Sequence, residues 1–259
     1  MIQAYIIMGC AGSGRRDIIA DLLDSVPAGC LVMLPAGEPA KPVDLRLGDK
    51  ASILRWEQSG AELRMPAPPP GTDSVVILID GTADPVEQLE KLVEWFKESK
   101  DVELARIITV VNSRLLYDNP HLKLWFDACL YFSDVVLFNK REEVPNKWFS
   151  DFQQRFSKLC YPCLFEFVKN GRVRNPVEVL YPEARRMSLA FEFDDGQPLY
   201  GSDDLVTGDF DIGDETDLEE TDDEDDDGLD DSAASDPYFE RDFSGRRKIR
   251  LPDIREYLG

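Results

Sequence analysis

The sequence has few of the residues that build disulfide-stabilised or zinc-binding proteins. Its 259 residues include five cysteines and one histidine, and only Cys160 and Cys163 lie close together. Scattered cysteines make no disulfide framework, and a structural zinc ion usually needs four Cys or His ligands. We therefore expect a reduced, cytoplasmic location and no zinc or other metal site, with Cys160 and Cys163 in the core.

Long apolar runs are also absent. No stretch reaches the length that a transmembrane helix needs, so we expect no membrane partner. The first residues, Met1-Ile-Gln-Ala-Tyr-Ile-Ile-Met, have neither a basic leader nor a small-residue cleavage site. This pattern favours a buried first strand over a signal peptide.

Basic residues are missing from one long segment. Of the 51 Asp and Glu residues, 22 lie between Met187 and Glu240, where there is no Lys or Arg. The remaining 29 acidic residues equal the 29 Lys and Arg of the chain, so the net charge of −22 belongs to this segment. Self-repulsion and few apolar residues predict disorder there, from about Phe193 to Pro237. A neutral remainder predicts no nucleic-acid partner, because nucleic-acid binding needs a basic surface.

Short apolar runs alternate with amphipathic segments of helical length over the first two thirds of the chain. This order is typical of βαβ units. It predicts an α/β fold with a parallel sheet of six or seven strands and helices on both faces. The expected strands are 2–8, 30–34, 74–80, 104–111, 135–138 and 163–168, and the expected helices are 16–25, 85–100, 120–132 and 147–159.

Composition divides the chain into three parts. We assign one α/β domain to 1–185, an acidic disordered segment to 186–240, and a basic amphipathic peptide to 241–259. The peptide places apolar residues among arginines, so it is either a docking segment, for the domain or for a protein partner, or an ordinary frayed terminus.

A glycine-rich sequence follows the first predicted strand. Gly9-Cys-Ala-Gly-Ser-Gly-Arg-Arg has the glycine spacing of the phosphate-binding loop G-x-x-x-x-G-K-[ST]. In such a loop, backbone N–H groups and the start of the next helix face an anion. The phosphate-binding candidates are Gly9, Gly12, Ser13, Gly14, Arg15 and Arg16.

Both functional side chains of that motif differ here. Arg15 stands where a lysine contacts the phosphates, and Arg16 stands where a hydroxyl holds Mg²⁺. A guanidinium does not ligate a cation, so we do not expect the usual Mg²⁺ site. Two interpretations stay open: residual phosphate binding, or a glycine-rich turn that is kept for packing.

Two further strand ends carry candidate site residues. Asn139-Lys140-Arg141-Glu142 follows a predicted strand and is similar to the guanine-reading sequence N-K-x-D, although an ordinary polar turn would look the same. Asn139, Lys140 and Glu142 are therefore base-binding candidates. Asp80 ends another predicted strand, where an acidic residue commonly serves Mg²⁺ chemistry, and it is the catalytic candidate. Asp84 is expected to cap the helix that begins at Pro85.

Four sequence blocks resemble those of the CobW/UreG/HypB-type metal-chaperone GTPases, and most closely those of the CobW-like branch. GCAGSGRRDIIADLL resembles its phosphate loop, GTADPVEQL its G-x-A-D-P block, IITVVN its strand ending V-V-D, and FSDVVLFNKREEV its N-K-x-D block. They occur in the family's order over residues 1 to about 160. The resemblance implies a P-loop NTPase fold and GTP or GDP as ligand.

The sequence also departs from that family. Residues 35–79 lack its Cys-x-Cys-Cys metal motif, Asn112 replaces an aspartate, and Leu78 falls at a glutamate position. The leading hypothesis is a divergent CobW-like nucleotide-binding protein with weak or no hydrolysis, acting through partner contacts. One alternative is an active GTPase in which Arg15 and Arg16 replace Lys and Mg²⁺. The other is a scaffold that binds no nucleotide and whose acidic tail binds basic partners.

Overall fold

The computed structural model describes residues 1–26, 29–60, 62–193 and 236–258. Contacts within the chain place 1–191 and 236–259 in one compact unit. Residues 194–235, which hold most of the acidic segment, lie outside the described residues.

A nine-stranded sheet forms the centre of the domain, in the order β4-β3-β2-β5-β1-β6-β7-β8-β9. The seven strands from β3 to β8 are parallel, and β4 and β9 each add an antiparallel edge. The predicted parallel sheet is therefore confirmed. The strands are β1 Ile2–Met8, β2 Cys30–Pro35, β3 Ser52–Ser59, β4 Glu62–Arg64, β5 Ser74–Leu78, β6 Val102–Asn112, β7 Val135–Asn139, β8 Leu164–Lys169 and β9 Arg172–Val173.

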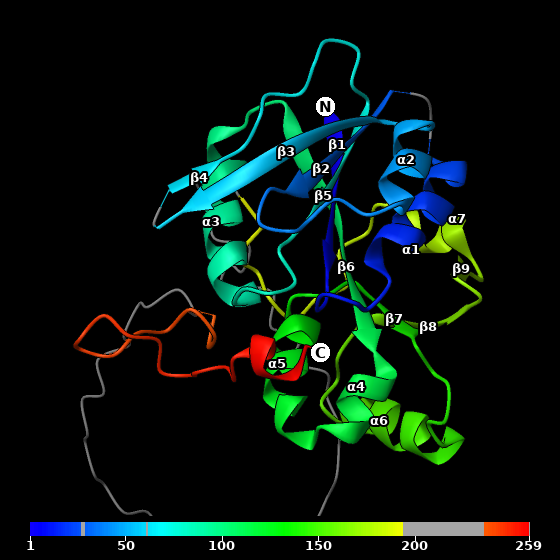
Figure 1. The fold of residues 1–259 in the computed structure, drawn as a ribbon. Coiled ribbons are helices and arrows are strands. Elements are labelled where there is room, and N and C mark those ends of the chain that lie inside the picture. The colour runs from blue at the N-terminus through cyan, green and yellow to red at the C-terminus, as the bar shows by residue number, and fades with distance from the viewer. Residues whose placement is uncertain (27–28, 61, 194–235, 259) are drawn as a thin grey trace, which may run out of the picture. The chain divides into compact units, whose positions relative to one another are not determined.

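Helices cover both faces of this sheet (Figure 1). The α-helices are α1 Arg15–Leu22, α2 Val43–Gly48, α3 Pro85–Glu98, α4 Ser113–Asp118, α5 Lys123–Tyr131, α6 Asn146–Lys158 and α7 Pro176–Leu180. One apolar core joins α3, α5 and α6 to the sheet, and a second joins α1, α2 and α7 to the opposite face.

The alternation of side chains along each strand explains the two cores. In β1, Ala4 and Ile6 belong to the first core, whereas Tyr5 and Ile7 belong to the second. Successive side chains of a strand point to opposite faces. A central strand covered on both faces must therefore be apolar throughout, as the sequence pattern predicted.

The segment between β2 and β5 contains elements that the sequence analysis missed. No strand or helix was expected between residues 34 and 74, but α2, β3 and β4 lie in this segment. β3 pairs with β2 near the edge of the sheet, and Trp56 is its one fully buried side chain. Such a strand lacks the continuous apolar run that identified the central strands.

Two aromatic residues within the predicted acidic segment, 186–240, pack on the domain. Phe191 is buried and its ring packs edge-on against Phe96, with centroids 5.7 Å apart. On the C-terminal side of residues 194–235, Tyr238 is buried, and its ring centroid lies 5.2 Å from that of Tyr131. At these positions the burial of aromatic side chains outweighs the local acidity. The average composition of a long acidic segment does not reveal such single buried residues.

Residues 236–258, which we call the C-terminal strap, pack on the domain rather than standing apart as a separate peptide. Arg247 forms ion pairs with Glu90 of α3 at 2.7 Å and with Asp84 at 3.5 Å. Ile254, in the short 3₁₀ helix Ile254–Tyr257, is 2% exposed. Carboxylates at and beside α3 thus neutralise Arg247, while Ile254 enters the core.

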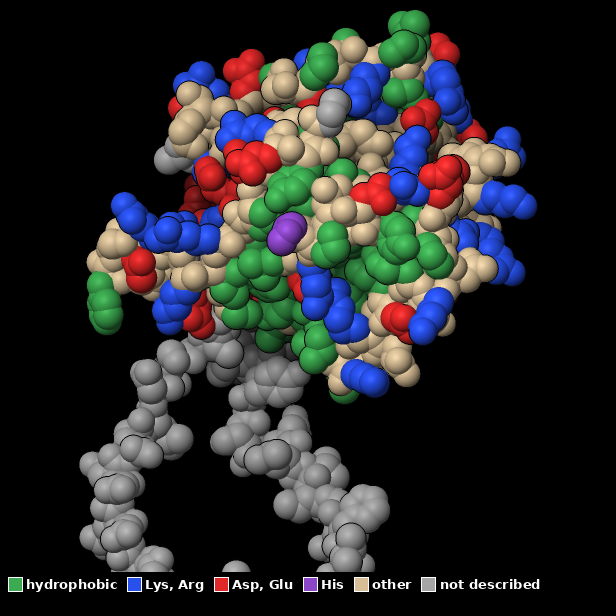
Figure 2. All heavy atoms as spheres, turned by 60° about the horizontal axis from the view of Figure 1, so that its bottom comes forward, with side chains coloured by type: hydrophobic (Ala, Val, Ile, Leu, Met, Phe, Trp, Pro, Cys, Tyr) green, Lys and Arg blue, Asp and Glu red, His purple; other side chains and the backbone are tan. Residues whose placement is uncertain are grey.

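Figure 2 shows apolar side chains gathered on one face of the domain, around the chain's only histidine, His121. Between α4, α5 and α6 this face contains a hollow of about 220 Å³, lined mainly by apolar side chains that include Trp148. Tyr117 and Leu124 are 38% and 40% exposed. None of the described helices is both long and apolar enough to cross a membrane.

Candidate functional site

The glycine-rich loop lies between β1 and α1, at the carboxyl end of the parallel strands, where open α/β sheets bind their ligands. Gly9 has φ 123°, and a Cβ there would lie 2.3 Å from the carbonyl oxygen of Val110 in β6. Gly14 precedes α1 with φ 89°, and a Cβ there would meet the amide of Asn139 at 2.5 Å. Close approach of β6 and Asn139 therefore requires glycine at both positions.

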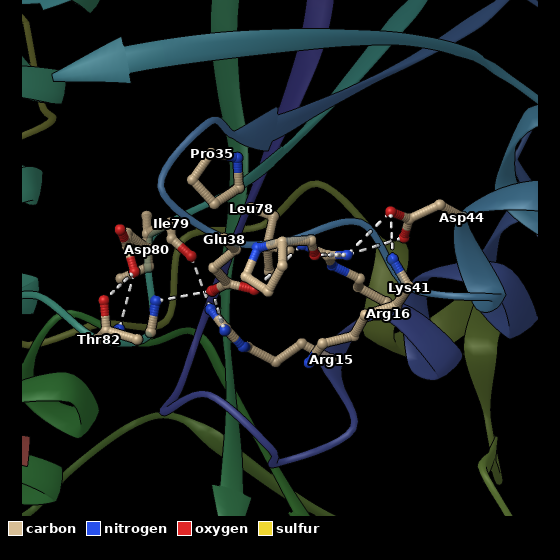
Figure 3. Close-up of polar contacts among 12 residues, drawn as sticks. Arg15, Arg16, Pro35, Glu38, Lys41, Asp44, Leu78, Ile79, Asp80 and Thr82 are labelled. Carbon is tan, nitrogen blue, oxygen red and sulfur yellow. Dashed lines mark hydrogen bonds and ion pairs between the residues drawn. The ribbon is translucent and has the colours of Figure 1, made fainter. Parts of the chain in front are cut away.

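Arg15 does not point into open solvent. It is 3% exposed, and its Nη1 donates a 2.6 Å hydrogen bond to the carbonyl oxygen of Ile79. Its Nη2 forms an ion pair with Glu38, which follows β2 and is also 3% exposed. The side chain predicted to contact phosphate is thus neutralised within the protein (Figure 3).

Arg16 is held by carboxylates as well. It is 4% exposed, and its Nη2 lies 3.2 Å from Glu38. Its Nη1 lies 3.0 and 2.9 Å from the two carboxylate oxygens of Asp44 and donates to the carbonyl oxygen of Pro39 at 3.0 Å. Glu38 therefore bridges Arg15 and Arg16 (Figure 3), and we call these two arginines with Glu38 and Asp44 the arginine–carboxylate cluster.

The loop after β5 closes over the glycine-rich loop. Ala11 donates its N–H to the carbonyl oxygen of Gly81 at 2.9 Å, and Gly81 donates its own N–H to Glu38 at 2.9 Å. The N–H of Ser13 bonds the carbonyl oxygen of Cys10 at 3.2 Å. The N–H groups of Ala11, Ser13 and Gly81 therefore have acceptors inside the protein. Glu38 supplies the negative charge opposite the guanidiniums of Arg15 and Arg16.

The surroundings of Glu38 decide its protonation. Burial opposes its charge, but Arg15, the N–H of Gly81 and Arg16 together outweigh burial and hold its pKa below the ordinary value of 4.5. A carboxyl whose pKa is lower in the folded state stabilises that state above the unfolded pKa, and this contribution is lost as the pH falls through the folded pKa.

Acid should therefore weaken the arginine–carboxylate cluster. We expect the difference in unfolding free energy between the wild type and Glu38→Gln to be largest above about pH 4.5 and to shrink as the pH falls further. Urea unfolding of both proteins over roughly pH 7 to 3 measures it. Taking the difference cancels the other carboxylates, and a difference that stays constant over this range would contradict the assignment.

The predicted base-binding residues lie beside the glycine-rich loop. Asn139, at the end of β7, donates from its side-chain amide to the carbonyl oxygen of Ser13 at 2.8 Å. A polar groove of about 600 Å³ is lined by Gly14, Asn139, Lys140 and Glu142, together with residues of α1 and the β8–β9 turn. The structure thus brings the two predicted sets of residues to one place.

Asp80 and Asp84 have structural contacts. The Asp80 carboxylate accepts hydrogen bonds from the N–H and the hydroxyl of Thr82, at 2.9 and 2.7 Å. Asp84 accepts from the N–H groups of Val86 and Glu87, at 2.8 and 3.1 Å, so its predicted helix-capping role is confirmed. Asp80, the catalytic candidate, shapes the loop that closes over Ala11.

The two neighbouring cysteines have different surroundings. Cys163 is buried as predicted, and burial raises its pKa to about 12. The prediction that Cys160 also lies in the core is wrong, because Cys160 is exposed in a turn with φ 56°. No group of three or more metal-ligating side chains occurs among the described residues.

Sequence reasoning missed Glu38, Asp44 and Gly81 as partners of the glycine-rich loop. Glu38 and Asp44 lie in a stretch without clear periodicity, and Gly81 stands out only as the first residue of the G-x-A-D-P-like block. One signal was present: two arginines at the start of a buried helix need nearby carboxylates, because buried charges are nearly always paired.

The sheet order and the glycine-rich loop after β1 define a P-loop NTPase-like α/β domain. No family model and no curated protein matches the chain. Among solved structures it is similar to the Zn(II)-bound YjiA GTPase from E. coli, with 12% identity and a TM-score of 0.47. It is also similar to a Zn(II)-bound triple mutant of the YjiA GTPase, with 13% identity and the same TM-score. Both matches cover 70% of this chain and 61% of the other.

Proposed function

We propose that this protein is a P-loop NTPase-like domain that does not turn over nucleotide and acts through contacts with a protein partner. The observation that carries the proposal is the arginine–carboxylate cluster. Arg15 and Arg16 occupy the positions whose side chains bind nucleotide phosphates and Mg²⁺ in a phosphate-binding loop. Both arginines are buried against Glu38, and Arg16 also pairs with Asp44. A polyphosphate would have to displace a buried carboxylate to reach them.

The same contacts count against an active GTPase that uses the two arginines in place of Lys and Mg²⁺. Transition-state stabilisation needs cationic groups aimed at the transferring phosphoryl. Here Arg15 is aimed at the Ile79 carbonyl oxygen and Glu38, and Arg16 is aimed at Asp44. Any guanine nucleotide in the groove beside Asn139 would therefore bind weakly and without an Mg²⁺ requirement.

The exposed apolar face supports the partner-binding part of the proposal. Tyr117, which is 38% exposed, lines the hollow together with Trp148. Figure 2 shows apolar side chains gathered on one face of the domain. Contiguous exposed apolar surface is a common mark of protein–protein contact. The acidic segment would add affinity for a basic partner, which keeps the scaffold hypothesis within the same proposal.

Calorimetry with GTP and GDP, in Mg²⁺ or in EDTA, tests the nucleotide part. We expect the wild type to bind weakly or not at all and to release no phosphate. Glu38→Gln removes the internal negative charge while keeping the side-chain shape, so it should bind GDP about tenfold or more tightly than the wild type, because charge-assisted hydrogen bonds contribute roughly 1.5–3 kcal/mol each.

Glu87→Gln is the matched control, because this glutamate lies on α3 outside the arginine–carboxylate cluster. It should leave nucleotide affinity unchanged. Tight, Mg²⁺-dependent binding by the wild type with steady phosphate release would contradict the proposal. An identical affinity in Glu38→Gln and the wild type would show that Glu38 does not block the site.

A further inference from the structure

A third hollow, a cavity of about 700 Å³, lies away from the glycine-rich loop. Arg106 of β6 and Leu164, the first residue of β8, form part of its wall, and residues 174–185 form the rest. Arg106 pairs in register with Tyr5, in the middle of β1, whereas the glycine-rich loop follows Met8. The cavity is therefore a different place from the candidate nucleotide site.

Arg106 is the unusual residue of this cavity. Its side chain is 1% exposed, its Nε donates to the carbonyl oxygen of Tyr181, and its Nη2 lies 3.9 Å from Glu183. Its Nη1 is buried, and no described residue accepts a hydrogen bond from it. Buried polar groups in folded proteins nearly always have partners, so this guanidinium nitrogen can take an acceptor from outside the domain.

The other charges around the cavity leave a positive excess. Arg174 is exposed and forms no ion pair with any described residue. Arg185 pairs with Glu183 at 2.9 Å, and Glu178 also lines the wall. Three guanidiniums, counting Arg106, therefore face two carboxylates.

A third carboxylate and its partners lie just behind this wall. Buried Asp134 already accepts from the N–H groups of Ile107 and Arg185 and from the Arg186 guanidinium. Arg186 offsets Asp134, and Glu166 lies outside the lining, 3.5 Å from the side-chain amide of Asn175. Among the side chains that line the cavity, one guanidinium therefore remains in excess, and an anion would balance it.

Apolar side chains stand beside these arginines. Val177 and Tyr181, on the wall of the cavity, are 76% and 60% exposed, and Leu164 adds further apolar surface. The volume falls within the roughly 300–1,000 Å³ of small-molecule sites, which combine apolar walls with a few fixed polar groups.

We infer that this cavity binds a small organic anion, a carboxylate or a phosphate monoester that carries an apolar group. The charged end is bound by Arg106 and Arg174, and the apolar part lies against Tyr181 and Val177. This inference does not depend on the proposed function of the nucleotide-site residues.

Calorimetry of the full chain with phenyl phosphate, benzoate, inorganic phosphate and phenol tests it. We expect saturable binding of phenyl phosphate or benzoate, and their relative affinity identifies the preferred anion. Inorganic phosphate should bind less tightly because it lacks the apolar part, and phenol should not bind because it lacks the charge.

Arg174→Gln should weaken binding of the preferred aromatic anion about tenfold, the loss expected for one charge-assisted hydrogen bond. Arg172→Gln is the matched control, since Arg172 is exposed only two residues away and lines the polar groove beside Asn139 instead. Arg106→Gln should abolish binding. Because that buried change can also unfold the domain, Arg174→Gln decides the test.

Three results would overturn the inference. The first is no saturable binding of either aromatic anion, and the second is phenol binding as tightly as phenyl phosphate. The third is an equal loss of affinity in Arg172→Gln and Arg174→Gln, which would place the bound anion in the polar groove or spread it over the general surface charge.

Discussion

Replacing Glu38 by alanine is expected to lower the free energy of unfolding by about 3–5 kcal/mol, the usual cost of removing one partner of a buried ion pair. Arg15 and Arg16 are 3% and 4% exposed, so neither guanidinium can recover its hydration without movement of the loop. The N–H of Gly81 would lose its acceptor at the same time. Urea unfolding at neutral pH measures the loss.

Asp24→Ala is the control for this experiment. Asp24 also forms an ion pair, with Lys50, but it is 66% exposed, and such surface pairs contribute only about 0–1 kcal/mol. A double variant, Glu38→Ala with Arg15→Met, should recover part of the stability, because it no longer leaves a buried charge at position 15. If Glu38→Ala lowered the unfolding free energy no more than Asp24→Ala, the prediction would be wrong. The two arginines would then have reached water or other acceptors in the variant.

Replacing Ile254 by alanine is expected to cost about 2–4 kcal/mol of unfolding free energy, because it removes buried methylene groups and leaves a cavity. Ile254 is 2% exposed and belongs to the same apolar core as Trp125. The expected loss is large for a residue of the C-terminal strap, where the regular structure near it is a single 3₁₀ turn. Urea or thermal unfolding measures the change.

Phe243→Ala is the matched control within the C-terminal strap. Phe243 lies in the turn between Arg241 and Arg247 and is fully exposed, so its removal should change stability by no more than about 0.5 kcal/mol. Replacing residues 194–235 by a short Gly-Ser linker should also cost no more than about 1 kcal/mol. If replacing residues 194–235 lowered the unfolding free energy more than Ile254→Ala, then that segment, and not the C-terminal strap, would stabilise the domain.

The sequence alone determined the central sheet and the location of the glycine-rich loop. A strand covered on both faces has to be apolar along its whole length, so β1, β5 and β6 were visible as runs of residues such as SVVIL. The cap at Asp84 was also predictable, because capping depends on residues two or three positions apart. Features of this kind depend on residues that are close together in the sequence, so they can be predicted without the fold.

The tertiary structure decided whether the glycine-rich loop is open to an anion. Glu38 lies 23 positions from Arg15, and Gly81 lies far beyond both, so no local pattern connects them. Their meeting depends on the order β2-β5-β1 in the sheet, which brings the loops after these strands to one edge. The strap could not be placed from composition either, because the ion pairs of Arg247 with Asp84 and with Glu90 of α3 span more than half of the chain. The sequence specified which charges are present, but only the fold determined which of them neutralise each other.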